Sequence, residues 1–475
     1  MKGLTVGKIA EICGGKVLRG NPSGLPERIS TDSREDLKDA LFVPVIGERT
    51  DGHRFLRQVA EKGAAAAFTS EGDPFADDAA GIPEDFALIA VEDTVKALQD
   101  LGRGCRKLHP IPLIGVTGSV GKTSTREIVA EALSAGKRVF RTKGNHNSQI
   151  GVPITLSELS DEDEIGVIEM GMSDFGEMAR LSRMVCPDAA VFTNVGEAHL
   201  EILGSQENIR SEKLHIQDCM PEHAVMFVNG DDPLLRDCPL REGVRRVRYG
   251  TSEGCDVRAV NIDMSHGQPR FDVIAGEERI PVVLQVYGMH HVLNASAALA
   301  VAKEYGVDLK KAAAAIGGFR GYRHRQQMTE RDGILVFDDA YNASPLSMKA
   351  SLDILEQLNN GGRRIAVLGD MKELGAEEYE MHAGVGRQLG GRRQADILFT
   401  LGDLARGIAA GVREAESAQG IPEDQRILIR SFDDRETLYQ ALLQEVKTGD
   451  TVLFKSSNSM KLYDLADRLG GNAEE

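Results

Sequence analysis

A glycine-rich turn that joins an apolar run to an amphipathic segment is the clearest candidate for chemistry in this sequence. Glycines let backbone N–H groups approach a polyphosphate, and the start of the following helix adds partial positive charge. Lys122 would reach the β- and γ-phosphates of a nucleotide, and Thr123 would hold Mg²⁺. The residues expected to contact the phosphates are Gly118, Ser119, Gly121, Lys122, Thr123 and Ser124.

The spacing of this loop departs from the strict phosphate-binding motif, because five residues rather than four separate Gly115 from Gly121. A plain tight turn between a strand and a helix is the alternative interpretation. The loop predicts ATP or GTP binding, but a switch GTPase, a kinase, a transporter ATPase and a ligase all carry such loops.

Two further strand ends carry groups that could bind a cation. Glu169 ends an apolar run, and His199 follows the next one, so both are expected at the sheet edge that faces the phosphate loop. A carboxylate there would hold Mg²⁺, although Glu169 could equally be a solvated acid and a lone His199 is more typical of a structural histidine. Lys213 lies in a predicted helix with acidic neighbours, and by itself it is typical of a surface lysine.

The elements that must position these residues are short and almost entirely apolar. Such strands are buried on both faces, which is typical of parallel sheets covered by helices. Each run is followed by a turn residue and then by helical periodicity, so we predict doubly wound α/β architecture with ligands at the carboxyl ends of the strands. The runs cover residues 113–117, 165–171, 189–195, 224–230, 334–339, 364–370, 397–403 and 451–456.

Two breaks in this pattern predict three domains. The segment 244–289 alternates polar and apolar residues around a Gly-containing turn, which indicates an antiparallel hairpin added to the central sheet. The Gly- and Arg-rich segment 317–325 interrupts the pattern. We therefore predict a small N-terminal α/β domain (1–92), a central domain with a mostly parallel sheet and helices on both faces (93–319), and a C-terminal Rossmann-like domain (320–475).

Composition excludes several classes of protein. The chain of 475 residues has a formal net charge of −17, which argues against a nucleic-acid binder. No apolar run is long enough to span a bilayer, and the N-terminal residues lack the features of a signal peptide. The six cysteines form no C-x-x-C pair, which suggests buried free thiols. We expect a cytoplasmic protein without membrane insertion.

Six motifs, in order and approximate spacing, resemble those of the Mur ligase family. They are TGSVGKTS, GNHNSQIGVP, EMGM, TNVGEAHLEILGS with Lys213, GMHHVLNASAALA and DDAYNASPLSMKA. Within the family, the greatest similarity is to the member that adds D-alanyl-D-alanine to a UDP-N-acetylmuramoyl-tripeptide. That similarity rests on DDAYNASP (338–345), IAVLGDMKELG (365–375), TDSR (31–34) and DGH (51–53), together with the absence of a DNPR motif.

The resemblance implies an ATP- and Mg²⁺-dependent ligase. ATP would phosphorylate the terminal carboxylate of the tripeptide, and the amine of D-alanyl-D-alanine would displace phosphate from the acyl phosphate. Cations must then cluster where negative charge develops. The resemblance implies a catalytic set of Lys122, Glu169, His199 and Lys213, with Thr123, Glu169, His199 and a carbamylated Lys213 as metal ligands. It also implies a monomer.

The remaining site residues are likewise implied by the resemblance. Asn294 would contact adenine, Arg325 would reach the ATP phosphates from the third domain, and Asp339 would bind the ribose hydroxyls. Tyr341 and Asn342 would pack on the nucleotide. The UDP substrate would be held by Thr31, Asp32, Ser33 and Arg34, with Asn145, Asn147 and Ser148 near its sugar and diphosphate.

Three positions depart from the family pattern. His291 and Ser148 each stand where the family usually has asparagine, and KSSN (455–458) replaces KGSR. The last change bears on how the third domain grips the incoming dipeptide. Another ligase of the same superfamily, such as the tripeptide-forming Mur ligase or folylpolyglutamate synthase, remains an alternative. A nucleotide switch without ligase chemistry is the alternative from a different class.

Overall fold

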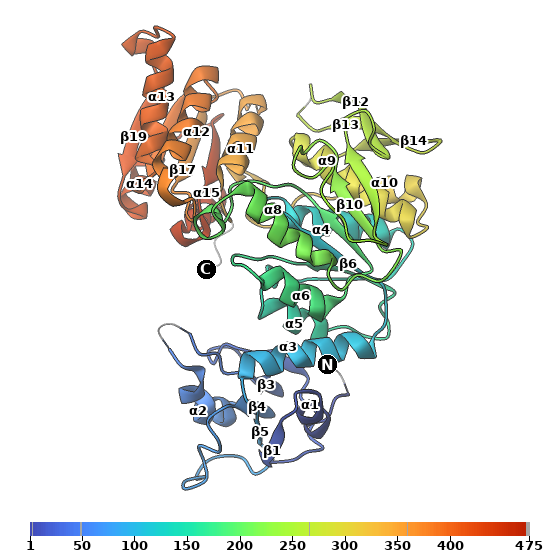
Figure 1. Ribbon diagram of the computed structural model, residues 1–475. Helices are drawn as coiled ribbons and strands as arrows, with labels where there is room; N and C mark the ends of the chain where they lie inside the picture. Colours follow the sequence, from blue (N-terminus) through green and yellow to red (C-terminus); the bar gives the residue numbers. More distant parts are fainter. Residues whose placement is uncertain (2, 48–49, 266, 359, 472–475) are drawn as a thin grey trace.

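The computed structural model describes residues 1, 3–47, 50–265, 267–358 and 360–471. Among these residues the strands form three sheets, each with its own helices (Figure 1). The N-terminal sheet lies at one end of the molecule, the central sheet in the middle and the C-terminal sheet at the other end. The predicted α/β class, with three domains and mostly parallel sheets, is confirmed.

The N-terminal sheet has the order β1-β5-β4-β3-β2, in which only β1 runs antiparallel to its neighbour. Its strands are β1 (Lys16–Arg19), β2 (Arg28–Ser30), β3 (Ala40–Phe42), β4 (Ala66–Thr69) and β5 (Ala87–Ala90). The helices of this part are α1 (Val6–Ile12), the 3₁₀ turn η1 (Gly52–Phe55) and α2 (Leu56–Glu61), and α3 (Thr94–Leu108) leads into the central sheet.

The central sheet has the order β14-β13-β12-β11-β10-β9-β6-β8-β7. Its strands are β6 (Leu113–Thr117), β7 (Val139–Arg141), β8 (Ile165–Glu169), β9 (Ala189–Phe192), β10 (Val225–Asn229), β11 (Arg245–Gly250), β12 (Val257–Asp263), β13 (Arg270–Ala275) and β14 (Glu278–Val283). All pairs from β7 to β12 are parallel, and β13 and β14 form the predicted antiparallel hairpin at the edge.

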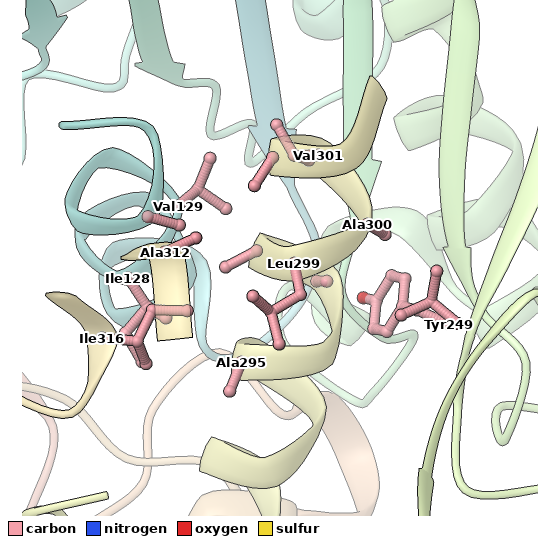
Figure 2. Close-up of a cluster of buried hydrophobic side chains, with 14 of the residues drawn as sticks. Ile128, Val129, Tyr249, Ala295, Leu299, Ala300, Val301, Ala312 and Ile316 are labelled. Carbon is pink, nitrogen blue, oxygen red and sulfur yellow. The ribbon is translucent and has the colours of Figure 1, made fainter. Parts of the chain in front are cut away.

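Helices cover both faces of the central sheet. They are α4 (Lys122–Ser134), α5 (Gly151–Ser157), α6 (Glu177–Val185), α7 (Leu200–Leu203), α8 (Gln206–Leu214), the 3₁₀ turn η2 (His215–Gln217), α9 (Met289–Glu304) and α10 (Leu309–Ile316). Figure 2 shows Ile128 and Val129 of α4 packed against Leu299 of α9 and Ile316 of α10. This apolar layer holds α4, and so the phosphate loop before it, against one face of the sheet.

The C-terminal sheet has the order β15-β16-β20-β17-β18-β19, with only the β15–β16 pair antiparallel. Its strands are β15 (Gln327–Arg331), β16 (Ile334–Asp338), β17 (Arg364–Gly369), β18 (Ile397–Leu401), β19 (Leu428–Phe432) and β20 (Thr451–Lys455). Its helices are α11 (Pro345–Gln357), α12 (Glu378–Arg392), α13 (Arg406–Ala418), α14 (Arg435–Glu445) and α15 (Leu462–Gly470), with the 3₁₀ turns η3 (Gly375–Glu377), η4 (Glu423–Gln425) and η5 (Asn458–Met460).

Hydrogen bonds and helix packing join the three parts of the chain. Thr94 at the start of α3 donates a hydrogen bond to the carbonyl of Pro44, and α3 packs along α5 of the central part. On the other side, the backbone N–H of Glu201 donates to the carbonyl of Glu373, 3.4 Å away. The central part of the chain is therefore in contact with both the N-terminal and the C-terminal parts.

The sequence predicts that no segment spans a membrane and that the cysteines are buried free thiols. Within the described ranges, no helix combines the length and the apolar character that crossing a membrane would take. All six cysteines are free, as expected, but only Cys105 and Cys238 are buried and the others are partly exposed. The prediction that all the thiols are buried is therefore wrong, because the other four lie at helix ends and in turns, where part of each residue stays exposed.

Candidate active site

The glycine-rich loop lies between β6 and α4, at the carboxyl end of the central sheet. A Cβ on Gly118 would lie 1.9 Å from the Thr193 hydroxyl, so only glycine fits this close approach. The segment after β9 then holds the loop in place. The Asn194 side chain accepts a hydrogen bond from the N–H of Val120 (2.9 Å) and donates one to its carbonyl (3.0 Å).

Lys122 begins α4 and folds back over the loop. Its ammonium donates hydrogen bonds to the carbonyls of Gly118 (2.8 Å) and Ser119 (3.3 Å). Burial lowers the pKa of Lys122, and the charge of Glu169 opposes that shift. The ammonium is thus already directed at the hollow of the loop, where a phosphate would replace the two carbonyls as its partner.

Glu169 ends β8 next to this loop and is almost completely buried, with 1% of its surface exposed. One carboxylate oxygen accepts a hydrogen bond from Asn147 (2.7 Å), and the other accepts one from Arg126 (3.0 Å). The interpretation of Glu169 as a solvated acid is therefore wrong. Each oxygen has a second lone pair, so the carboxylate fits a cation ligand whose plane is already set.

Lys213 lies in the last turn of α8 and has no exposed surface. Its Nζ is buried without a hydrogen-bond partner, and burial together with the charge of Lys122 drives its pKa well below the usual value. The interpretation as a surface lysine is wrong. A neutral buried amine is the form that reacts with CO₂, so the environment of Lys213 fits a carbamate and the cation that a carbamate would bind.

His199 lies on the loop after β9, with a positive φ of 65°. Its Nδ1 is 2.7 Å from Glu373 Oε2 of the C-terminal domain, and this contact lowers the pKa of Glu373. The structure therefore places His199 in contact with the third domain. The side-chain partners of Glu169, in contrast, are Arg126 and Asn147 of the central domain.

The nucleotide side of the predicted site comes from two domains. Asn294 of α9 accepts a hydrogen bond from the Thr125 hydroxyl (2.9 Å), while its Nδ2 is buried without a partner. Arg325 lies over the ring of Tyr341, 4.1 Å from the centroid, and its Nε is also without a partner. Unsatisfied buried donors are rare in folded proteins. Their presence at two predicted ATP contacts fits a site that a nucleotide completes.

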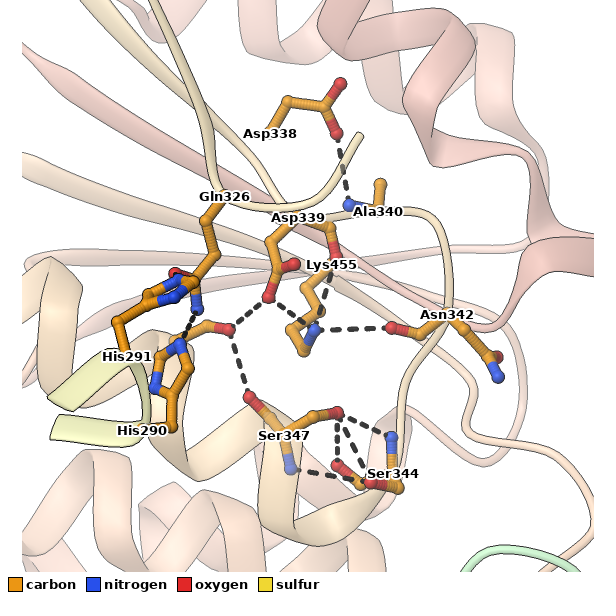
Figure 3. Close-up of polar contacts among 11 residues, drawn as sticks. His290, His291, Gln326, Asp338, Asp339, Ala340, Asn342, Ser344, Ser347 and Lys455 are labelled. Carbon is orange, nitrogen blue, oxygen red and sulfur yellow. Dashed lines mark hydrogen bonds and ion pairs between the residues drawn. The ribbon is translucent and has the colours of Figure 1, made fainter. Parts of the chain in front are cut away.

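Asp339 follows β16 and is held by two side chains (Figure 3). Its Oδ2 accepts hydrogen bonds from the Lys455 ammonium (2.6 Å) and the Ser351 hydroxyl (2.6 Å). Lys455 also donates to the carbonyl of Asn342 (3.2 Å), whose side chain is exposed. Lys455, the first residue of the altered KSSN segment, therefore organises the turn that carries the predicted ribose contact.

The predicted substrate residues Thr31, Asp32, Ser33 and Arg34 form a turn after β2. The Arg34 guanidinium donates to the carboxylate of Asp32, which lowers the pKa of Asp32 to about 2. The Arg34 side chain is 87% exposed. Helix α5, which follows the segment with Asn145, Asn147 and Ser148, packs against β2, the strand that precedes this turn.

Sequence reasoning missed Arg126, which has no exposed surface and binds Glu169, Glu127 and the carbonyl of Gly144. The sequence held one signal for Arg126, its position one helical turn after Lys122, which places both residues on the same face of α4. Lys455 and Gln326 were also missed, and their contacts are made only through the fold.

Comparisons with known proteins agree with this geometry. The family described as Mur ligase middle domain matches residues 116–302, and the family described as Mur ligase, glutamate ligase domain, matches residues 324–458. The UDP-N-acetylmuramoyl-tripeptide–D-alanyl-D-alanine ligase of Bacillus subtilis is 35% identical over 98% of both chains. The enzyme of the same name from Escherichia coli is 32% identical over 99% of both chains.

Solved structures are similar over the same length. MurF from Acinetobacter baumannii has a TM-score of 0.85 and 28% identity, covering 98% of both chains. The MurF ligase of Thermotoga maritima in complex with ADP has a TM-score of 0.78 and 30% identity, covering 94% of this chain and 99% of that one. With two Mur ligase family models matched in sequence and relatives 35% and 32% identical over nearly its full length, this chain belongs to the Mur ligase family.

Proposed function

We propose that this chain joins D-alanyl-D-alanine to UDP-N-acetylmuramoyl-tripeptide, with ATP converted to ADP and phosphate. The observation that carries the proposal is full-length similarity to ligases of that name, combined with buried, unsatisfied donors on Lys213, Asn294 and Arg325. The product would be the UDP-linked pentapeptide precursor of peptidoglycan. Its substrates are intracellular nucleotides and peptides, so we place the reaction in the cytoplasm.

The proposed reaction has two steps, a phosphoryl transfer and the formation of the amide bond. A carboxylate oxygen of the tripeptide attacks the γ-phosphorus of ATP, and ADP leaves. The free amine of D-alanyl-D-alanine then attacks the acyl carbon, the C–O bond to phosphate breaks, and the ammonium proton is released to solvent. Lys122 and the backbone N–H groups of the loop hold the γ-phosphoryl oxygens while negative charge develops on them.

One Mg²⁺ would be held by the Thr123 hydroxyl and the Glu169 carboxylate, and a second by His199 and the carbamate of Lys213 near Glu169. When bound, these cations would neutralise the oxygens of the transferring phosphate. Arg126 and Asn147 keep the Glu169 carboxylate in one orientation before any cation arrives. His199 would offer its Nε2 to a cation while its Nδ1 keeps the contact with Glu373.

The nucleotide would lie between the central and C-terminal domains. Asn294 would donate its free Nδ2–H to the adenine, and Arg325 would place its guanidinium on the phosphates. The Oδ2 of Asp339 is bound to Lys455 and Ser351, so we assign Oδ1 to the ribose hydroxyls. Tyr341 would form the wall behind Arg325.

The proposal also covers the binding site for the UDP-sugar, the domain boundaries and the oligomeric state. The turn 31–34 and the segment 145–148 would bind the UDP-sugar. The domain boundaries are placed after residues 92 and 319, and the protein is a monomer. Light scattering at the mass of one chain, 51.5 kDa, would support the last point, and a dimer mass would contradict it.

The test is phosphate release from ATP and Mg²⁺ with the tripeptide substrate alone, the dipeptide alone, or both. The proposal expects release that requires both, with the UDP-linked pentapeptide as product. Release that ignores both would favour a nucleotide switch, and replacement of the dipeptide by other amines would favour another ligase of the family. Lys122→Ala should abolish release, whereas Lys96→Ala, an exposed lysine on α3, serves as the control.

A further inference from the structure

The turn that joins the central and C-terminal domains has an unusual backbone. His324 and Gln326 both have positive φ angles, 58° and 57°, and Arg325 lies between them. This left-handed region is disfavoured for residues other than glycine, so tertiary contacts have to maintain it. The contacts of the two flanking side chains show how the turn is held.

His324 anchors the turn to the C-terminal domain. Its Nδ1 is 2.6 Å from Asp338 Oδ2, at the end of β16. Its ring lies 5.0 Å from the ring of Tyr463 in α15. Both partners belong to the third domain, and therefore one side of Arg325 is fixed there.

Gln326 anchors the other side of the turn to the central domain (Figure 3). Its Oε1 lies 2.8 Å from His291 Nε2, and its Nε2 lies 2.8 Å from His290 Nε2. Both histidines are in the first turn of α9. One amide therefore bridges two neighbouring imidazoles across the domain junction.

The chemistry of the bridge assigns the protons. An amide oxygen accepts and an amide nitrogen donates, so His291 carries its proton on Nε2 and His290 on Nδ1. The reverse orientation would put a proton on His291 Nδ1, which is buried without a partner. An orphaned N–H is rarer than an orphaned lone pair, which favours the orientation observed. Burial lowers the pKa of both rings. The charge of Asp339 raises the pKa of His290, and the charge of Lys455 lowers it.

We propose that Gln326 is a positioning residue, which fixes Arg325 relative to Asn294 so that both meet one nucleotide. Asn294 lies one helical turn after His291 on α9, and Arg325 directly precedes Gln326. The bridge therefore joins the helix that carries the adenine contact to the turn that carries the phosphate contact. The inference rests on the proposed function only in assigning these two residues to ATP.

The first test measures binding of AMP-PNP with Mg²⁺ by calorimetry. Gln326→Leu removes two hydrogen bonds and should weaken binding about tenfold. If Gln326 acts through Arg325, the double variant with Arg325→Ala should bind no more weakly than Arg325→Ala alone. Unchanged binding in Gln326→Leu, or losses that add in the double variant, would overturn the proposal.

The matched control is Gln388→Leu. The Gln388 amide also bridges side chains, Asp353 (3.0 Å) and Gln394 (3.2 Å), but entirely within the C-terminal domain. It should lower thermal stability without changing nucleotide affinity. Because AMP-PNP binding needs no UDP substrate, failure of the ligase reaction and failure of this inference give different results.

A spectroscopic test follows the protons directly. In ¹⁵N-histidine-labelled protein at neutral pH, His290 and His291 should both be neutral, with the proton on Nδ1 in the first and on Nε2 in the second. Gln326→Glu offers two acceptors, so His290 should move its proton to Nε2. Identical tautomers in the wild type, or no switch in Gln326→Glu, would refute the bridge.

Discussion

Replacing Arg126 by methionine should strongly destabilise the central domain. Arg126 and Glu169 are 0% and 1% exposed, and they meet at 3.0 Å. Methionine keeps the side chain long and apolar but removes the charge. The substitution therefore leaves a carboxylate buried without its cation.

The size of the effect follows from which partners remain. Glu127, the other carboxylate on Arg126, keeps an ion pair with Arg141 at 3.0 Å. Glu169 keeps a hydrogen bond from Asn147 but no contacting cation among the ion pairs found in the described residues. Breaking one partner from a buried pair costs about 3–5 kcal/mol. We assign most of that cost to Glu169.

The assay is hydrogen exchange of the β6 and β8 amides in protein free of nucleotide and Mg²⁺, because a chain of several domains does not unfold in one two-state step. Protection should fall by roughly two to three and a half powers of ten, the equivalent of about 3–5 kcal/mol. Adding Glu169→Gln should restore much of it, since the uncompensated charge is then gone.

The control is Arg245→Met. Arg245 also pairs with a carboxylate, but the Arg245 and Glu304 side chains are 52% and 33% exposed, so water can solvate Glu304 when the arginine is removed. The cost should be nearer to about 1 kcal/mol. Equal losses in the two variants, or a loss below about 1 kcal/mol in Arg126→Met, would refute the reasoning that burial of Glu169 sets the magnitude.

Three further predictions concern other groups. Lys122→Ala should lose AMP-PNP binding in calorimetry, because the only ammonium seen folded over the described loop is removed; undiminished binding would exclude the loop as the phosphate site. Lys213→Met should abolish ligase turnover yet leave the unfolding free energy unchanged or about 1–3 kcal/mol higher, since an unpartnered buried amine disappears; a large loss of stability would contradict this. Burial lowers the pKa values of His290 and His291 in the folded chain. Below about pH 6.5 the unfolded chain therefore binds protons on these two rings that the folded chain does not bind. The unfolding free energy should fall by up to about 1.4 kcal/mol per pH unit for each ring. His291→Asn should make that slope shallower in thermal unfolding followed against pH, and an unchanged slope would show that the ring is not buried as a neutral base.

Much of the fold could be predicted from the sequence because its signals are local. A buried parallel strand needs a run of apolar residues, and β6, β8 and β9 each lie within a predicted run. The hairpin of β13 and β14 showed its alternation and its Gly-containing turn. The phosphate loop was equally visible, since its glycines and Lys122 are neighbours in the chain.

The state of each candidate group was decided by tertiary structure. Lys213 has polar and acidic neighbours in sequence, yet the packing of α8 leaves its amine with no exposed surface. The contact of His199 with Glu373 joins residues of two domains, and no local pattern specifies it.

One physical reason separates the features that the sequence predicts from those that depend on tertiary structure. Backbone geometry is set by a few neighbouring residues, so strands, helices and the phosphate loop can be predicted from their own segments. Burial and charge pairing depend on which distant segments pack together, and these determine pKa values and the partners of polar atoms. The sheets and the phosphate loop therefore follow from local segments, whereas the hold of Arg126 on Glu169 and the bridge from Gln326 to His290 and His291 exist because distant segments pack together.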